Sequence, residues 1–289
     1  MEGLRKKGNI SKSKKNKGEM EMEEELVDYE HINKDNDYQS VTFDFLEPDH
    51  KYSSSLYMLT KKTFSFVTWD VFTLFDAICE QNELGIFLGI APDEDEDLSN
   101  NKKLPGQGET DEIYALLTIL NLQLLKTGDF AGRLAKFVLA NTPAESQQFL
   151  TSILLERPEK TGLLINDRVI NLPFMIVPNV FDQFMEDKKF IDTEYDLEEQ
   201  YMYNFDYILY FVPCYISQNA KKGLEIEQTH QGPAFANYLY YKQEDKHLLK
   251  KALLIHEVPH KLSEEFKLLM AILKYEDFLI MVGTKSIFN

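Results

Sequence analysis

The sequence predicts an α/β or α+β fold, a single domain in which helices flank a central mixed sheet. Short apolar runs typical of strands alternate with segments of helical spacing from about residue 41 to residue 289. Such interleaving indicates a layered domain of sheet and helices. In addition, 44% of the 289 residues are apolar, which is enough to fill one large core, and no obvious boundary divides residues 41–289.

The first half of this domain is expected to begin with a strand, because apolar and polar residues alternate from Val41 to Phe45. Residues 113–120 would suit a helix as well as a strand, and the bracketing Asn121 and Gly128 favour the strand. The other elements expected here are helices at 52–62 and 69–82 and a buried strand at 85–91.

The second half contains one strong helix start. Thr142 as N-cap, Pro143 at the first helical position and Glu145 as capping-box partner predict a helix that ends near Glu156. Further helices are expected after Pro173, with Ile176, Val180, Phe181 and Phe184 on its apolar face, and after Ser263, with Phe266, Leu269, Met270 and Leu273. Strands are expected at 163–169, 201–212, 235–241, 250–255 and 278–282.

Residues 1–40 differ in kind from the rest of the chain. Seven basic residues form two clusters near the start: Arg5, Lys6, Lys7, Lys12, Lys14, Lys15 and Lys17. Glu2 is the one acid before residue 18, so the local charge is +6. A block of seven acids without a base follows at 19–30. Such charge blocks bury no apolar surface, so we expect a disordered tail. The basic clusters resemble a nuclear localisation signal; the alternative is a lysine-rich tail without that role.

The net charge restricts the partners. The chain has 31 Lys and Arg against 48 Asp and Glu, a formal charge of −17. An acidic surface repels phosphate backbones, so we expect no direct nucleic-acid binding and a preference for basic proteins. The longest uncharged apolar stretches (113–125, 169–181 and 207–220) are shorter than a membrane-spanning helix, so no membrane partner is expected.

Two acidic stretches are candidate binding surfaces for a basic partner. We expect 92–112 to be a long loop, and its candidate residues are Asp93, Glu94, Asp95, Glu96 and Asp97. The candidate residues of the second stretch are Asp192, Glu194, Asp196, Glu198 and Glu199. The alternative for each stretch is an ordinary solvated segment without a binding role.

One motif resembles a zinc-protease signature. Residues 256–260 match H-E-x-x-H, whose chemistry needs both histidines one turn apart on a helix. Pro259 lies inside the spacing and disfavours a helical Val258, and the preceding apolar residues indicate the end of a strand. We therefore expect no zinc site here.

Other catalytic patterns are missing from the sequence. It contains no G-x-G-x-x-G or Walker pattern, and Gly106-Gln107-Gly108 lies in a polar loop. Cys79 and Cys214 lie in apolar surroundings, are too few for a disulfide framework and indicate a reducing compartment. We expect no catalytic, cofactor or metal residues.

Residues 162–173, with the sequence GLLINDRVINLP, resemble the GLLLSERFINVP segment that marks the BCCIP/Bcp family of eukaryotic nuclear proteins. Further segments fall in the family's order, namely 41–45, 74–85, the acidic loop before Ile113, 119–122, 207–210 and 235–237. The resemblance covers about residues 41 to 273. The chain departs from the family pattern in a short linker between Tyr215 and Phe235 and in an extension after Leu273.

The resemblance implies a fold similar to the GNAT acetyltransferases without their activity, and the sequence contains no Q/R-x-x-G-x-G/A loop for acyl-CoA. Family members are adaptors and chaperones. The fungal branch is linked to a large-subunit ribosomal protein and to nuclear export of a lipid kinase. The animal branch is linked to a recombination mediator and a cyclin-dependent-kinase inhibitor. Because of the two departures, the ribosomal role is the one we carry over.

The expectation is therefore a non-enzymatic adaptor or chaperone that binds basic clients in ribosome biogenesis and nuclear protein export. We expect it to be a monomer without a cofactor. We also expect it to be located in the nucleus with shuttling to the cytoplasm, and to bind nuclear transport factors. The alternatives are an acyltransferase with a divergent cofactor loop, which a titration with acetyl-CoA would identify, and a cell-cycle or DNA-repair scaffold.

Overall fold

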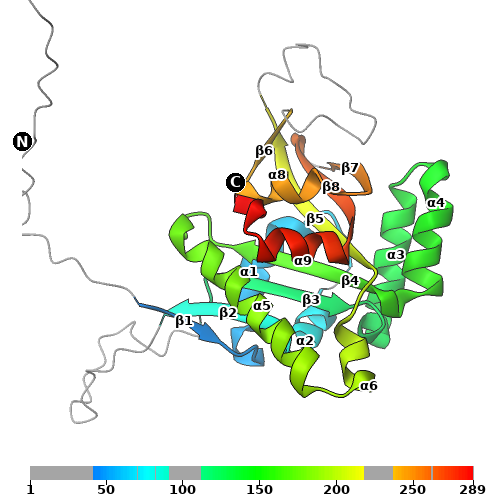
Figure 1. Cartoon of the computed structure of the whole chain (residues 1–289). Helices are drawn as coiled ribbons and strands as arrows, with labels where there is room; N and C mark the ends of the chain where they lie inside the picture. The colour runs from blue at the N-terminus through cyan, green and yellow to red at the C-terminus, as the bar shows by residue number, and fades with distance from the viewer. Residues whose placement is uncertain are drawn as a thin grey trace, which may run out of the picture. The chain divides into compact units, whose positions relative to one another are not determined.

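The computed structural model describes residues 42–69, 71–81, 83–90, 112–217, 237–261 and 263–288, without the side chains of 126–128 (Figure 1). The strands of this described part form one sheet in the order β1-β2-β3-β4-β5-β8-β7, with β6 paired to β5 outside that path. The strands are β1 (Phe43–Leu46), β2 (Gly85–Ile90), β3 (Ala115–Asn121), β4 (Thr161–Arg168), β5 (Tyr207–Ile216), β6 (Tyr238–Tyr240), β7 (Leu254–His260) and β8 (Ser263–Lys274).

Helices cover both faces of this sheet. They are α1 (Ser53–Phe64), α2 (Phe72–Glu80), α3 (Phe130–Ala140), α4 (Ala144–Thr151), α5 (Val177–Glu194), α6 (Leu197–Gln200), α8 (Gln243–Leu249) and α9 (Tyr275–Gly283). Buried side chains of α1 to α4 share one core cluster, and those of α5, α8 and α9 share the other. Figure 1 shows α5 and α9 on the near side of the sheet. The fold is the predicted mixed α/β architecture with one open sheet flanked by helices.

Only one strand pair in the described sheet is parallel. β4 and β5 pair from Thr161 with Tyr207 to Leu164 with Tyr210, and every other recorded pair is antiparallel. Beyond Leu164 the register ends, although β4 continues to Arg168 and β5 to Ile216. The two strands therefore part toward their carboxyl ends.

The predicted elements of the first half are confirmed. β1, α1, α2 and β2 lie where the sequence placed them, and 113–120 forms β3 rather than a helix. All seven β3 residues are buried, with Leu116 and Leu120 facing one core cluster and Leu117 and Ile119 the other. A strand buried on both faces is a continuous apolar run, which explains why its sequence also suited a helix.

The α4 helix is confirmed, but its predicted cap is wrong. Pro143 is the N-cap and makes no side-chain bond to the helix. The Thr142 hydroxyl instead donates to the Leu139 carbonyl at 3.2 Å, at the end of α3. The chain continues from α4 through a π-helical turn to Glu156, the end that the sequence predicts.

Two predictions near the carboxyl end are wrong in type. The helix expected after Ser263 is β8, a 12-residue strand between β5 and β7. Its apolar residues satisfied helical spacing only because both faces are buried: Phe266, Leu268, Met270 and Ile272 face one core, and Leu269, Ala271 and Leu273 face the other. The strand expected at 278–282 belongs to α9. Its buried residues, Tyr275, Phe278, Met281 and Val282, follow a helical spacing.

Several boundaries also differ. β5 begins at Tyr207 rather than 201, because Tyr201–Tyr203 form a 3-10 turn. The strand expected at 250–255 begins only at Leu254 and runs to His260. α8 was not predicted, because it is short. Predictions for the tail 1–40, the acidic loop at 92–111 and residues 235–236 lie outside the described residues.

No helix in the described part of the chain has the length and apolar character needed to cross a bilayer.

Gly162, at the start of the GLLINDRVINLP segment, provides a test of the packing between the sheet and its neighbours. A Cβ at this position would lie 2.3 Å from Ile119 Cγ2 and 3.3 Å from the Phe205 ring. Both neighbours are buried, so Gly162→Ala should lower the free energy of unfolding by about 1–3 kcal/mol in urea denaturation.

Gly283→Ala is the matched control, because its nearest side-chain neighbour, Met185 Cε, is 3.9 Å away. We expect no loss of stability for this variant. Equal stability of the two variants would contradict the packing described for Gly162.

Candidate functional site

A cluster of charged side chains is buried where β4 and β5 part. We call it the buried charge cluster. Its members come from α1, β4, β5 and the start of α8, and they are Thr63, Asn166, Asp167, Arg168, Tyr210, Lys242, Glu244 and Asp245.

The alternation of β4 distributes the cluster over both faces of the sheet. Asn166 and Arg168 lie on the same face as Leu164 and reach Glu244 on α8. Asp167 lies on the opposite face and accepts hydrogen bonds from the Thr63 hydroxyl of α1 at 3.1 and 3.0 Å. Successive side chains of a strand point to opposite faces, so the Asn-Asp-Arg sequence contacts both helical layers.

Arg168 and Glu244 form a two-pronged ion pair. One guanidinium nitrogen contacts Oε1 and the other lies 3.0 Å from Oε2, and the Asn166 amide donates to Oε1 at 3.1 Å. Burial favours the neutral form of Glu244, but the hydrogen bonds and charge of Arg168 outweigh it, so the pKa of Glu244 is lowered. Such bidentate geometry fixes orientation as well as charge, so the pair anchors α8 to β4.

Lys242 connects the two faces. Its ammonium donates to the backbone carbonyl of Asn166 and lies 3.5 Å from Asp167 Oδ1 and 3.7 Å from Asp245 Oδ1. Burial raises the pKa of Asp167, and the charge of Lys242 opposes that rise. A single cation thus offsets carboxylates on α8 and on the far face of β4.

Asp245 is the excess acid of the cluster. Its side chain is fully buried, Oδ1 accepts from the Tyr210 hydroxyl, and Oδ2 has no hydrogen-bond partner. Burial is the main cause that raises its pKa to about 7; Glu244 adds to the rise, while Lys242 and the Tyr210 hydrogen bond oppose it. With three carboxyl groups against two cations, the cluster is neutral when Asp245 holds a proton.

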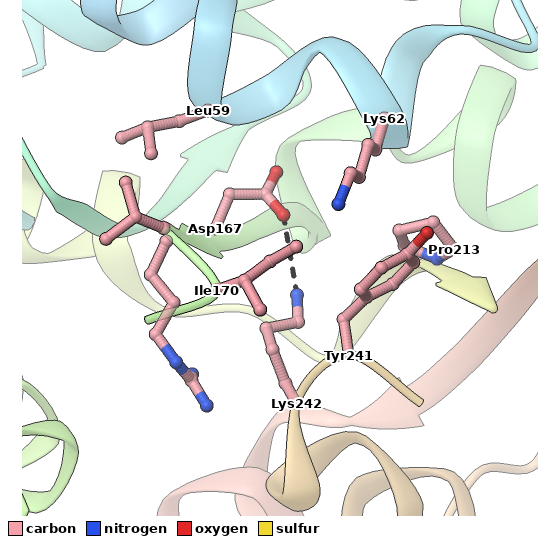
Figure 2. Close-up of a pocket in the computed structure, with 9 residues that line it drawn as sticks. Leu59, Lys62, Asp167, Ile170, Pro213, Tyr241 and Lys242 are labelled. Carbon is pink, nitrogen blue, oxygen red and sulfur yellow. Dashed lines mark hydrogen bonds and ion pairs between the residues drawn. The ribbon is translucent and has the colours of Figure 1, made fainter. Parts of the chain in front are cut away.

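A small pocket lies over the cluster on its α1 side (Figure 2). Its free volume is about 30 Å³, and Leu59, Lys62, Ile170, Pro213 and Tyr241 surround Asp167 and Lys242. The crevice beyond the carboxyl ends of parallel strands is a common ligand site in α/β sheets. Here side chains fill the crevice and leave room for only about one or two water molecules.

The H-E-x-x-H segment lies on β7, so the helical spacing that a zinc site needs does not exist here. His256 Nε2 lies 3.2 Å from the Ser146 hydroxyl, and Glu257 accepts from Tyr238 and pairs with Lys267 at 3.3 Å. The His260 ring contacts Phe66. Within the described residues, no three His, Cys, Asp or Glu side chains gather as a metal site.

The predicted binding residues are only partly described. Asp93 to Asp97 and the basic residues from Arg5 to Lys17 lie outside the described residues. In the second acidic stretch, Asp192 pairs with Lys188 within α5, and Asp196 caps α6 by accepting from the amides of Glu198 and Glu199. These two acids therefore have structural roles.

The remaining acids of that stretch, Glu194, Glu198 and Glu199, are exposed, and apolar side chains lie among them. Leu197 is 83% exposed and Phe190 is 58% exposed. We call these five residues the α5–α6 surface. The sequence indicated its acids but not the exposed apolar residues, because sequence alone gives no exposure.

The first expected outcome concerns Lys242→Met, which leaves the carboxylates of Asp167 and Asp245 without their shared cation. Loss of one partner from a buried ion pair leaves an uncompensated charge, so the free energy of unfolding should fall by about 3–5 kcal/mol at pH 7. Urea denaturation measures this. Arg157→Met, which breaks an exposed pair with Asp206 at 3.2 Å, is the control and should cost less than about 1 kcal/mol. Similar losses in both variants would contradict a special role of Lys242.

The second expected outcome is a pH dependence. The pKa of Asp245 is about 7 in the folded protein and near 3.8 in the unfolded chain. Between these pH values the folded state therefore holds one proton more than the unfolded state. Stability should therefore decrease as pH rises from 5 to 8. In urea denaturation, Asp245→Asn should reduce this decrease and be more stable relative to wild type at pH 8 than at pH 5. Asp206→Asn, at an exposed position, is the control and should keep the wild-type dependence of stability on pH. An unchanged pH dependence in Asp245→Asn would contradict the prediction.

Comparisons with known proteins agree on one family. The BCCIP family model matches residues 39–248. Protein bcp1 of Schizosaccharomyces pombe is 21% identical over 242 residues, covering 78% of this chain and 76% of the relative. Protein BCP1 of Gibberella zeae is 23% identical over 145 residues, and the Protein BCCIP homolog of Arabidopsis thaliana is 25% identical over 146 residues. Each of these two matches covers 50% of this chain, and they span 49% and 40% of the respective relatives.

The fold is similar to that of a solved structure, the crystal structure of BCP1 from Saccharomyces cerevisiae. The TM-score is 0.56 at 14% identity, over 89% of this chain and 92% of that chain. The matched family model spans more than half of the 289 residues and includes the segment that forms β4 and the buried charge cluster. The chain therefore belongs to the BCCIP family.

Proposed function

We propose that this chain is a non-enzymatic nuclear adaptor or chaperone for basic client proteins, with a large-subunit ribosomal protein as the expected client. The α5–α6 surface carries the proposal. Its carboxylates Glu194, Glu198 and Glu199 have no ion-pair partner among the described residues, and Leu197 and Phe190 are exposed beside them.

The chemistry of this surface suits a basic protein. Ribosomal proteins carry dense Lys and Arg where they meet RNA, and complementary charge accelerates association with such a surface and selects it over others. Exposed apolar side chains within an interface supply contact area that charge alone does not. A surface that combines both can cover a basic client before the client meets RNA.

The filled crevice between β4 and β5 supports a binding role over catalysis. Among the charged residues that line it, Asp167 pairs with Lys242 and Arg168 pairs with Glu244 beneath it, and the free volume is about 30 Å³. This space is far smaller than the pockets that hold substrates or cofactors. The proposal includes a role in ribosome biogenesis and in nuclear export. It also includes a nuclear localisation signal in the basic residues from Arg5 to Lys17.

The test neutralises the α5–α6 surface and measures client capture. Affinity purification from nuclear extract at moderate salt should recover mainly large-subunit ribosomal proteins with the wild-type chain. The triple variant Glu194→Gln, Glu198→Gln, Glu199→Gln should reduce this recovery about tenfold, since each exposed charge contributes up to about 1 kcal/mol.

The matched control has the same change of charge at exposed positions outside this surface: Glu80→Gln, Glu156→Gln and Glu264→Gln. It should capture clients as the wild type does. Equal losses in both triple variants would show an effect of net charge alone, and a catch without ribosomal proteins would refute the proposed client. Neutralising Asp93–Asp97 tests the other acidic stretch in the same way.

A further inference from the structure

The outward face of α8 is basic, in a chain whose net charge is −17. Lys246, Lys250 and Lys251 are exposed and His247 is partly buried. Spacings of three and four residues place these side chains on one side of the helix and of the turn that continues it. We call the four residues the α8 basic face.

The acids of α8 point the other way. Glu244 and Asp245 are fully buried, where Glu244 pairs with Arg168 and Asp245 accepts from the Tyr210 hydroxyl. Both belong to the buried charge cluster. From residue 241 to residue 256 the chain therefore exposes no acidic side chain. The exposed lysines are not neutralised by their own helix.

The neighbouring elements do not neutralise them either. The three lysines have no ion-pair partner among the described residues. α8 packs against β6, β8 and the 3-10 turn Ser286–Phe288, and neither β6 nor this turn contains a charged residue. Lys285, directly before the turn, pairs with Asp182 at 2.8 Å. Glu276 and Asp277, at the start of α9, form no ion pair with the lysines.

The acids of β8 lie far from α8 along the strand. Asp245 contacts Tyr210, and Tyr210 pairs with Ala271 of β8. Glu264 and Glu265 are at the other end of β8, about 20 Å from Ala271 at the usual rise of a strand. They are too distant to offset the charge of the α8 basic face.

The pKa of His247 agrees with a positive potential at this face. Burial lowers the pKa, and the charges of Lys250 and Lys246 lower it further, while Glu244 opposes them. Nearby cations disfavour the protonated imidazole. The local potential therefore has the opposite sign to the net charge of the chain.

We propose that the α8 basic face binds a short acidic segment of a partner protein. From Lys246 to Lys251 the helix rises by about 7.5 Å, a length that a few carboxylates can match. A nucleic acid would extend its phosphates beyond this length and over a chain that is otherwise acidic. Leu253, which is 46% exposed, adds apolar contact next to the lysines. The α8 basic face and the α5–α6 surface would thus select partners of opposite charge.

The first test measures binding of a fluorescein-labelled peptide of eight Glu residues around a central Leu. Fluorescence anisotropy at low salt should show saturable binding to the full chain. The triple variant Lys246→Gln, Lys250→Gln, Lys251→Gln should bind about tenfold more weakly, since three exposed charges are lost. Absence of saturable binding, or wild-type affinity in this variant, would overturn the proposal.

The matched control makes the same change of charge at exposed positions outside α8: Lys61→Gln, Lys136→Gln and Lys261→Gln. It should bind the peptide as the wild type does, and an equal loss in both variants would refute a specific site. The basic residues from Arg5 to Lys17 are unchanged in both variants, so they cannot cause a difference between them.

Two further readouts identify the site and the class of partner. Saturating peptide should raise the pKa of His247, followed by NMR of its imidazole protons, and an unchanged pKa would place the peptide elsewhere and overturn the proposal. A single-stranded oligonucleotide of equal charge should bind more weakly than the peptide. Tighter binding that is lost in the α8 variant would overturn the assignment to a protein partner.

Discussion

The arrangement of the sheet's centre depends on the contacts that the ammonium of Lys242 makes. It lies where β4 and β5 lose their pairing, and it contacts carboxylates of β4 and α8 and a backbone carbonyl of β4. Removing a charge from water is costly unless its partners surround it. The strands can part there only because Lys242, Arg168 and their carboxylates satisfy one another. The same compensated side chains fill the crevice beyond the carboxyl ends of the two strands.

Much of the fold could be predicted because local patterns and tertiary context agree. β1 has polar and apolar alternation, and α5 carries its apolar residues on one face, so each matched its prediction. β8 and α9 were assigned to the wrong type because the deciding information is not local. Most of β8 is buried on both faces, so its sequence lacks the alternation of polar and apolar residues that indicates a strand. The local sequence of residues 263–274 also does not indicate that β5 and β7 pair with this segment.

The sites were predictable only in part. The acids between Asp192 and Glu199 are evident in the sequence, but the cap made by Asp196 and the exposure of Leu197 are properties of the folded chain. A signal for the buried charge cluster did exist: Asp167 and Arg168 directly follow an apolar run, where charged side chains need partners. Their partners are about 75 residues away at Lys242 and Glu244, and no local pattern connects them.

The position of β8 has a consequence for how the chain folds during synthesis. β8 pairs with β5 on one side and β7 on the other, yet it is made after every other strand of the described sheet. Until the ribosome has released residues 263–274, β5 exposes the edge that β8 will cover, and an exposed strand edge invites pairing with other chains. The nascent chain is therefore most vulnerable to aggregation just before translation of β8 is complete, and slow closure of this long-range pair would limit its folding rate.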